Sequence, residues 1–382
     1  MKISQVVVDD LSNAAEKLSV AAQIAPQLVF VFGCVAHFTH PEFFPLLTSA
    51  FPGAELVGCT TAGEISSVAV TNKTSVITAI HFETANFQVV TAELATMDGS
   101  HQAGYDLATR LQAPDLRAVM LFGQGVNING SALIEGMTSV LGTSLPITGG
   151  LAGDEGAFSR TYTLSSSGIS TTTNVAVGLA GDKLLFSHGS FGGWKAFGPT
   201  RKVTKCIGNV LYELDDKPAL DVYKRYLGDY AKDLPGSGLL FPFEMLGDSR
   251  ESLGQIRTIL GVNEEDGSLI LAGAINPDGY LRLMHAHTND LVDGAETAAH
   301  ASIEGSPDIV GQRLGLLVSC VGRKLVMGGR VDEEVEAVQD ILGDQTTLCG
   351  FYSNGEICPG YKLEVCSLHN QTMTITYLAE MN

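Results

Sequence analysis

Four short turns place a carboxylate directly after a glycine at the end of an apolar, strand-like run. Glycine lets a ligand approach the backbone closely, and the carboxylate can bind an amine or another hydrogen-bond donor. The same carboxylate can instead accept backbone N–H groups and hold its own loop. A pair of acids acting in hydrolysis is a third possibility. The four pairs are Gly63 with Glu64, Gly153 with Asp154, Gly247 with Asp248, and Gly355 with Glu356.

The first and last of these turns are the strongest candidates for ligand contact. Thiol, hydroxyl, aromatic and amide side chains precede Glu64 and Glu356. Such groups can orient a small polar molecule beside an acid. The sequence therefore predicts a binding site that includes, besides these two acids, Cys59, Thr60, Thr61, Phe351, Tyr352, Ser353 and Asn354.

Nucleophilic catalysis has less support in the sequence. Cys34 and Cys320 stand at matching strand ends, in "FGCVAH" and "VSCVGR", and His37 follows the first. A thiol nucleophile is conceivable there, although buried structural cysteines are commoner. The sequence contains no GxSxG, P-loop, HExxH or dinucleotide-binding GxGxxG motif. We therefore expect binding rather than an enzymatic activity.

Three histidines are candidate metal ligands. His285 and His287, in "LMHAHTND", are two residues apart, so on a strand they share one face, as a metal pair would. His188, in "FSHGSFGGW", precedes a glycine-rich turn and the single tryptophan, Trp194, which can be a packing anchor or a pocket wall. Cys358 precedes a proline, and a Cys-Pro thiolate can ligate haem iron.

The turns belong to a repeated unit of strand, helix, strand, Gly-acid turn and two further alternating strands. Four such β-α-β-β-β units predict an α/β protein with mixed sheets covered by helices. A pseudo-twofold duplication would then give two related halves of two units each, residues 1–200 and 201–382, that meet near residues 195–205. Pockets form preferentially at such interfaces and at the carboxyl ends of strands.

Composition limits the partners. The chain of 382 residues has 23 basic and 42 acidic residues, a formal charge of −19, which argues against nucleic acid or an anionic membrane. No run approaches the roughly 20 apolar residues of a membrane span, and the N-terminus lacks a basic and apolar leader. Seven cysteines without a CxxC pair indicate a reducing compartment. We expect a cytoplasmic protein.

Several longer stretches together resemble the FIST family, with its N-terminal and C-terminal parts. They include "GCTTAGEI", "GGLAGD", "HGSFGGW", "RTILGVNEEDGSLILAG", "SCVGRKLVMGGRVDEEVEAV" and "CGFYSNGEICPG", and they cover nearly the whole chain. The doubled histidine of "LMHAHTND" departs from the family pattern. The motif residues that the resemblance carries over are Gly58, Thr61, Gly63, Glu64, Gly149, Gly150, Gly153, Asp154, Trp194, Arg323, Tyr352, Gly355 and Glu356.

The resemblance implies a sensory, ligand-binding protein without enzymatic activity. Stand-alone members of this length are similar to the NosP group, which holds haem, senses nitric oxide and regulates histidine kinases or cyclic-di-GMP enzymes such as diguanylate cyclases and phosphodiesterases. For a haem, His188 is the first candidate axial ligand, followed by His285 and His287. Two alternatives stay open: a sensor of an amino-acid-like molecule without haem, and a small-molecule enzyme that uses paired acids or a cysteine.

Overall fold

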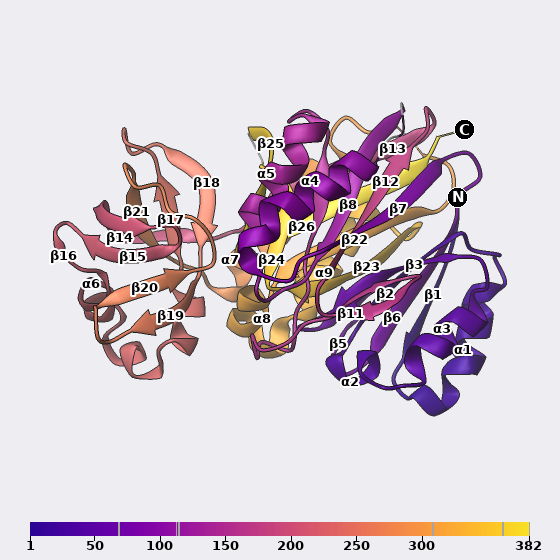
Figure 1. The fold of residues 1–382 in the computed structure, drawn as a ribbon, viewed down its shortest axis with the longest axis horizontal. Helices are drawn as coiled ribbons and strands as arrows, with labels where there is room; N and C mark the ends of the chain where they lie inside the picture. Colours follow the sequence, from indigo (N-terminus) through magenta and orange to yellow (C-terminus); the bar gives the residue numbers. More distant parts are fainter. Residues whose placement is uncertain (68, 112, 114, 308, 361–362, 382) are drawn as a thin grey trace.

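The computed structural model describes residues 1–67, 69–111, 113, 115–307, 309–360 and 363–381. It contains three six-stranded mixed sheets and one eight-stranded sheet (Figure 1). The predicted α/β class with mixed sheets, internal duplication and covering helices is confirmed. Within the described ranges, no helix is long and apolar enough to cross a membrane.

One order of elements occurs three times: strand, helix, strand, helix, a strand parallel to the previous one, a two-strand segment, and a closing antiparallel strand. The first copy contains β1 (Lys2–Val8), α1 (Ala14–Ala22), β2 (Leu28–Gly33), α3 (Phe43–Ala50), β3 (Glu55–Thr60), β4 (Glu64–Ser66), β5 (Val70–Thr71) and β6 (Ser75–His81). The second contains β7 (Asn86–Glu93), α4 (Ser100–Arg110), β8 (Leu116–Gly123), α5 (Gly130–Leu141), β9 (Ile147–Leu151), β10 (Thr163–Ser165), β11 (Gly168–Ser170) and β12 (Thr173–Ala180).

The third copy is interrupted after its first strand. It contains β13 (Leu184–Phe191), α7 (Thr288–Ile303), β22 (Arg313–Cys320), α9 (Asp332–Leu342), β23 (Thr346–Ser353), β24 (Gly355–Gly360), β25 (Leu363–His369) and β26 (Met373–Glu380). The short helices α2 (Val35–Phe38) and α8 (Val321–Met327) follow the first parallel strands of the first and third copies. Together the three copies form what we call the body.

The three copies exchange their two-strand segments in a cycle. Strands β4 and β5 of the first copy extend the sheet of the third copy at β23. Strands β10 and β11 of the second copy extend the first sheet at β3. Strands β24 and β25 of the third copy extend the second sheet at β9. Each Gly-acid turn of the body therefore lies where the chain leaves one sheet and enters the next.

The inner faces of the three sheets share one core. The ring of Phe32 lies 4.8 Å from that of Phe351 and 5.6 Å from that of Phe122, so the three sheets are joined by aromatic contacts. Helices α1, α3, α4, α5, α7 and α9 pack on the opposite faces. Burial of apolar area on both faces explains the nearly continuous apolar sequence of strands such as β2 and β22.

A glycine in the second parallel strand of each copy permits close packing. A Cβ atom at Gly58, Gly149 or Gly350 would lie only 1.8, 2.1 or 1.8 Å from a carbonyl oxygen of the neighbouring parallel strand. No side chain can replace glycine there without moving the backbone. The repeated "GC", "GG" and "CG" of the sequence thus has a structural cause.

The segment of the predicted third unit folds differently from the other copies. It forms what we call the insertion, residues 195–285, which lies between β13 and α7 and projects from one side of the body (Figure 1). Its elements are β14 (Lys195–Ile207), β15 (Val210–Leu214), β16 (Lys217–Pro218), α6 (Ala219–Leu227), β17 (Phe243–Leu246), β18 (Ser252–Arg257), β19 (Ile259–Asn263), β20 (Ser268–Leu271) and β21 (Tyr280–His285).

The helix and strands predicted for this segment are present, but all of its described strand pairs are antiparallel. Strand β14 turns directly into β15 through Gly208, so no helix crosses over between parallel neighbours as in the three copies. The division into halves at residues 1–200 and 201–382 stays a prediction.

Candidate functional site

A cleft of about 610 Å³ lies where the insertion meets the body, and we call it the interdomain cleft. Its volume falls in the range of small-molecule sites. The body contributes Ser190, Phe191, Gly192, Gly193, Trp194, Gly360, Ser367, His369 and Thr372. The insertion contributes Glu244, Glu251, Ser252, Leu253, Gly254, Gln255, Ile256 and Met284.

The charged groups of the interdomain cleft are acidic. Glu244 is 9% exposed and accepts hydrogen bonds from Arg282 at 3.0 and 2.6 Å and from the Ser252 hydroxyl at 2.7 Å. Glu251 is exposed, and hydrogen bonds led by that from the Ser249 hydroxyl lower the pKa of its carboxyl. No described lysine or arginine lines the cleft. Glu251 is therefore the carboxylate available to a cationic or hydrogen-bond-donating ligand.

His369 lies in the wall of the interdomain cleft and is only 3% exposed. Its Nε2 atom lies 2.9 Å from the carbonyl oxygen of Cys358, which can only accept, so Nε2 carries the proton. Burial lowers the pKa of this imidazole to about 4. At neutral pH the ring is uncharged, and its Nδ1 atom is an acceptor.

Trp194 is the predicted site residue that lines the interdomain cleft. Its Nε1 atom donates a 2.8 Å hydrogen bond to the carbonyl oxygen of Gln371, and the side chain is 9% exposed. The indole is therefore both an anchor at the entrance to the insertion and part of the cleft wall.

Arg323 and Tyr352 belong to a buried network behind the cleft. Arg323 forms a 2.6 Å ion pair with Glu334, and neither side chain is exposed. The Tyr352 hydroxyl donates to the same carboxylate at 2.6 Å. Arg323 also donates to the carbonyl of Gly192, which lines the cleft. The guanidinium thus positions the glycine-rich turn rather than reaching the cleft itself.

Glu64 and Glu356 accept hydrogen bonds from equivalent positions in two copies of the repeat. One oxygen of Glu64 accepts from the Thr61 hydroxyl at 2.5 Å. The other accepts from the N–H and hydroxyl of Thr74 at 3.2 and 2.8 Å. Burial, the largest cause, raises the pKa of Glu64. This pattern supports the loop-holding interpretation, because the acid ties its turn to the start of β6.

The corresponding bonds of Glu356 come from the Ser353 hydroxyl at 2.8 Å and from the N–H and hydroxyl of Thr372 at 3.1 and 3.0 Å. Complete burial raises the pKa of Glu356 to about 7. Thr372 lines the interdomain cleft, whereas Glu356 does not. Glu356 therefore does not line the cleft itself and contacts its wall through Thr372.

Three of the four predicted turns meet. The N–H of Gly153 donates to the carbonyl of Thr60 at 2.8 Å, and that of Ala62 donates to the carbonyl of Tyr352 at 2.8 Å. The N–H of Asn354 donates to the carbonyl of Leu151 at 3.2 Å. The turn at Gly247 and Asp248 lies in the insertion instead, because that segment does not share the exchanged topology.

Asn354 is half-buried and lines a separate cleft of about 190 Å³, but most of the other predicted residues of these turns are buried. Asp154 accepts the N–H groups of the three residues from 158 to 160 at 2.8, 2.6 and 2.9 Å, as a loop-holding acid does. Cys59 and Phe351 lie in the central core, Thr60 is fully buried, and Gly150 is paired with Glu356 between β9 and β24. Their role as ligand contacts stays a prediction.

The three histidines predicted as metal ligands do not line the interdomain cleft. His188 lies on β13 opposite Thr376 of β26, and burial lowers its pKa. The rings of His285 and His287 lie 5.5 Å apart. In the part of the chain that the structure describes, no three His, Cys, Asp or Glu side chains are arranged to hold a metal ion. His369, which does line the cleft, has its Nε2 occupied by Cys358, so the cleft residues do not fit a haem held through that atom.

The cysteines discussed as nucleophiles are buried and free. Desolvation raises the pKa of both the Cys34 and the Cys320 thiol. A protonated thiol is a poor nucleophile, so neither side chain is activated for catalysis.

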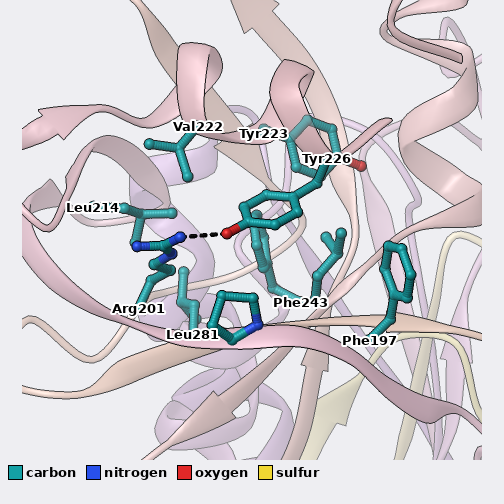
Figure 2. A pocket seen from close by; sticks show the side chains of 10 residues that line it. Phe197, Arg201, Leu214, Val222, Tyr223, Tyr226, Phe243 and Leu281 are labelled. Carbon is teal, nitrogen blue, oxygen red and sulfur yellow. Dashed lines mark hydrogen bonds between the residues drawn. The ribbon is translucent and has the colours of Figure 1, made fainter. Parts of the chain in front are cut away.

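A second cavity lies inside the insertion, between α6 and the sheet. Figure 2 shows Tyr226 and Phe197 among the residues that line it, with Arg201 donating a hydrogen bond to the Tyr226 hydroxyl. Its volume of about 10 Å³ has room for about one water molecule. It does not accommodate an organic ligand in this conformation.

Sequence reasoning missed most of the interdomain cleft. Glu244 and Glu251 stand in "FPFEMLGDSRES", which drew attention only through its Gly-Asp pair, and His369 stands in "LHNQT". The acid-rich hairpin was a usable signal, but only the tertiary fold brings it into one cleft with Trp194.

A body of exchanged α/β repeats, an inserted antiparallel sheet and a small-molecule cleft between them define a ligand-binding protein. Residues 27–217 match the FIST N domain and residues 219–359 match the FIST C domain. The chain belongs to the FIST family, and this membership implies a sensory, ligand-binding role.

Other similarities are more distant. A stretch of 95 residues, 24% of this chain, is 37% identical to the uncharacterized protein MJ1623 of Methanocaldococcus jannaschii, and it spans 18% of that protein's length. Cyanuric acid hydrolase from A. caulinodans matches over 100% of this chain and 99% of its own, with 8% identity and a TM-score of 0.41. Another cyanuric acid hydrolase structure matches over 99% of both chains, with 10% identity and a TM-score of 0.36.

These solved structures correct one expectation. Their chains match this one over 100% and 99% of its length and are hydrolases. The prediction that this chain has no enzymatic activity is therefore wrong, because an activity is not excluded. At such TM-scores the likeness assigns no reaction to this chain.

Proposed function

We propose that this protein is a sensor that binds a small molecule with an apolar part and a cationic or hydrogen-bond-donating end in the interdomain cleft. The observation that carries the proposal is the composition of the cleft wall. Phe191, Trp194 and Met284 offer apolar surface, and Glu251 offers an exposed carboxylate. This carboxylate accepts a hydrogen bond from the Ser249 hydroxyl, but no lysine or arginine among the described lining residues competes for it. Amines and amino-acid-like molecules have this combination of groups.

The signal would arise from the position of the cleft between two parts of the chain. A ligand that contacts both walls binds most tightly when the insertion lies against the body, so it shifts the population toward that arrangement. The chain passes between the two walls at Gly192 and Gly193, and Gly193 has a positive φ of 77°. A partner that contacts both parts would detect the change. The family resemblance suggests a histidine kinase, a diguanylate cyclase or a phosphodiesterase as that partner.

The single tryptophan makes the proposal testable without a label. A panel of amines and amino acids is titrated while the fluorescence of Trp194 and the melting temperature are recorded. We expect at least one compound to change both in a saturable manner. Glu251→Gln should weaken its binding by at least about tenfold, since one charged hydrogen bond is worth roughly 1.5–3 kcal/mol. Glu265→Gln, an exposed change in the insertion outside the cleft, is the matched control.

Two results would contradict the proposal. One is the absence of any saturable change in Trp194 fluorescence across the panel. The other is equal affinity of the wild type and Glu251→Gln for every compound that binds.

The haem-based nitric oxide sensor remains a prediction from resemblance. Its first candidate axial ligand, His188, does not line the interdomain cleft and is the first residue to substitute. Protein purified from cells with ample haem should show a Soret band that shifts with nitric oxide and is lost in His188→Ala. A protein without a Soret band would exclude the haem sensor. The ligand proposed for the interdomain cleft would be unaffected, because the Trp194 titration tests it separately.

A further inference from the structure

A second cleft lies on the other side of β18, and we call it the α5 cleft. It has a volume of about 470 Å³ and is bounded by α5 and β25 of the body and by β18 and residues 274–276 of the insertion. Figure 1 shows β18 facing β25 and α5 across the junction of the two parts. Leu253, Gln255 and Ser367 line both this cleft and the interdomain cleft, whereas Arg257, Ser131 and Glu135 line only the α5 cleft.

The wall of the α5 cleft contains a buried guanidinium without an acidic partner. Arg257 is 3% exposed, and none of its hydrogen bonds goes to a carboxylate among the described residues. Its acceptors are the carbonyl oxygens of Ala274, Ile256 and Leu368 and the amide oxygen of Gln255, at 3.1 to 3.2 Å. Desolvation lowers the pKa of Arg257 to about 10, so the group still carries its charge at neutral pH.

This guanidinium has a hydrogen-bonding capacity that the protein does not use. Arginine has five N–H groups. Four hydrogen bonds are accounted for, and Nη2 donates only to Gln255. Because the Gln255 oxygen faces Arg257, its amide nitrogen points away from that bond, and this nitrogen has no described acceptor. Two neighbouring donors, one of them charged, are the arrangement that a carboxylate or phosphate accepts.

The surroundings favour an anion over a neutral ligand. A buried charge with only neutral acceptors is costly, and an added anion recovers part of that cost through an interaction in low dielectric. The only acid lining the α5 cleft among the described residues is Glu135, which is exposed on α5. Ser131 and Ser367 add hydroxyl groups to the wall.

We propose that the α5 cleft binds an oxyanion, the carboxylate or phosphate group of a small molecule, between the free N–H of Arg257 and the amide of Gln255. This proposal does not rest on the ligand proposed for the interdomain cleft, although the two clefts share Gln255. Because Arg257 of the insertion already donates to the carbonyl of Leu368 in the body, a bound anion strengthens the same junction. The oxyanion is thus a second ligand that stabilises the contact between the insertion and the body.

The test compares sodium phosphate and sodium succinate with sodium chloride at equal ionic strength and pH 7. We expect a saturable rise in the melting temperature of the full chain with at least one of the two oxyanions. The stronger of the two identifies the recognised group. Chloride gives only the unsaturated change expected of screening.

Gln255→Glu is the decisive variant, because it places a carboxylate where Arg257 already donates. We expect this variant to melt higher than the wild type without added oxyanion and to respond at least tenfold more weakly to phosphate or succinate. Arg257→Lys keeps the positive charge but removes the planar set of N–H donors, so it should also lose the rise in melting temperature with oxyanion. Glu135→Gln removes a repelling charge and should strengthen it about twofold.

The proposal fails if neither oxyanion raises the melting temperature of the wild type more than chloride does. It also fails if Gln255→Glu keeps the full response, because the anion would then bind elsewhere. Glu251→Gln in the interdomain cleft should leave the rise in melting temperature with oxyanion unchanged. The two proposed sites can therefore fail independently, and the experiments show which one has failed.

Discussion

Glu356 accepts two hydrogen bonds from Thr372, from its N–H at 3.1 Å and from its hydroxyl at 3.0 Å, and Thr372 lines the interdomain cleft. Glu64 and Thr74 form the same pair in another copy of the repeat, at 3.2 and 2.8 Å. The acid that the sequence suggests as a ligand contact therefore binds first to the residue before β26, and it reaches the cleft only through Thr372.

The buried Glu356 gives stability a defined pH dependence. Its pKa is about 7 in the folded chain against an ordinary value of 4.5. Between these values the folded state holds a proton that the unfolded state releases, so this group makes the protein less stable as pH rises from about 4.5 to 7. Glu356→Gln should remove this contribution, roughly 3 kcal/mol.

Urea unfolding of the wild type and Glu356→Gln at several pH values between 5 and 8 checks this expectation. The difference between the two proteins isolates Glu356 from His369, whose lowered pKa acts in the opposite direction. Glu64→Gln, with equivalent hydrogen bonds, should show the same sign of effect. Parallel pH profiles for wild type and Glu356→Gln would refute the assignment.

Gly350 should not tolerate alanine. A Cβ atom there would lie 1.8 Å from the carbonyl oxygen of Leu317, and the φ angle is 153°. We expect Gly350→Ala to lower the free energy of unfolding by more than about 3 kcal/mol or to prevent folding. Gly329→Ala, where nothing lies within 4 Å, should change stability by less than about 1 kcal/mol. Thermal unfolding of both variants tests the close approach of the parallel strands, and equal melting temperatures would argue against it.

The ion pair of Arg323 and Glu334 should stabilise the fold rather than contact ligand. Tyr352→Phe removes one hydrogen bond to Glu334 and should cost about 1–2 kcal/mol. Arg323→Ala leaves a buried carboxylate unpaired and should cost roughly 3–5 kcal/mol. Tyr352→Phe should bind the ligand of the interdomain cleft with unchanged affinity, as measured by Trp194 fluorescence. A tenfold loss of affinity in this variant would instead make Tyr352 a ligand contact.

The cysteine thiols should react slowly. Desolvation raises the pKa of Cys34 and Cys320, so little thiolate forms at pH 8. Alkylation followed by mass spectrometry should modify the half-buried Cys206 before either of them. Rapid modification of Cys34 or Cys320 in the folded protein would revive a nucleophilic role. Cys34→Ala and Cys320→Ala are expected to retain ligand binding.

Particular residues show how far the sequence can be taken. The alternation of strands and helices, and the glycines before Glu64, Asp154 and Glu356, are local patterns. They predicted the α/β class and the strand, helix, strand and Gly-acid turn that the three copies share. The insertion has a helix and strands with the same local patterns, so its antiparallel pairing was not visible in periodicity alone. Trp194 was included in the predicted site through the family resemblance, and it lines the interdomain cleft.

The sequence by itself determined which segments are strands, which are helices, and where a glycine must precede an acid, because these depend on side-chain size and period. Only the tertiary structure decided that the copies exchange strands and that the insertion brings Glu251 into the same cleft as Trp194 and buries Arg257 against Leu368. Such contacts join residues more than 50 positions apart, and no local pattern encodes them. The turns were therefore readable from the chain, whereas the clefts depend on how the insertion packs against the body.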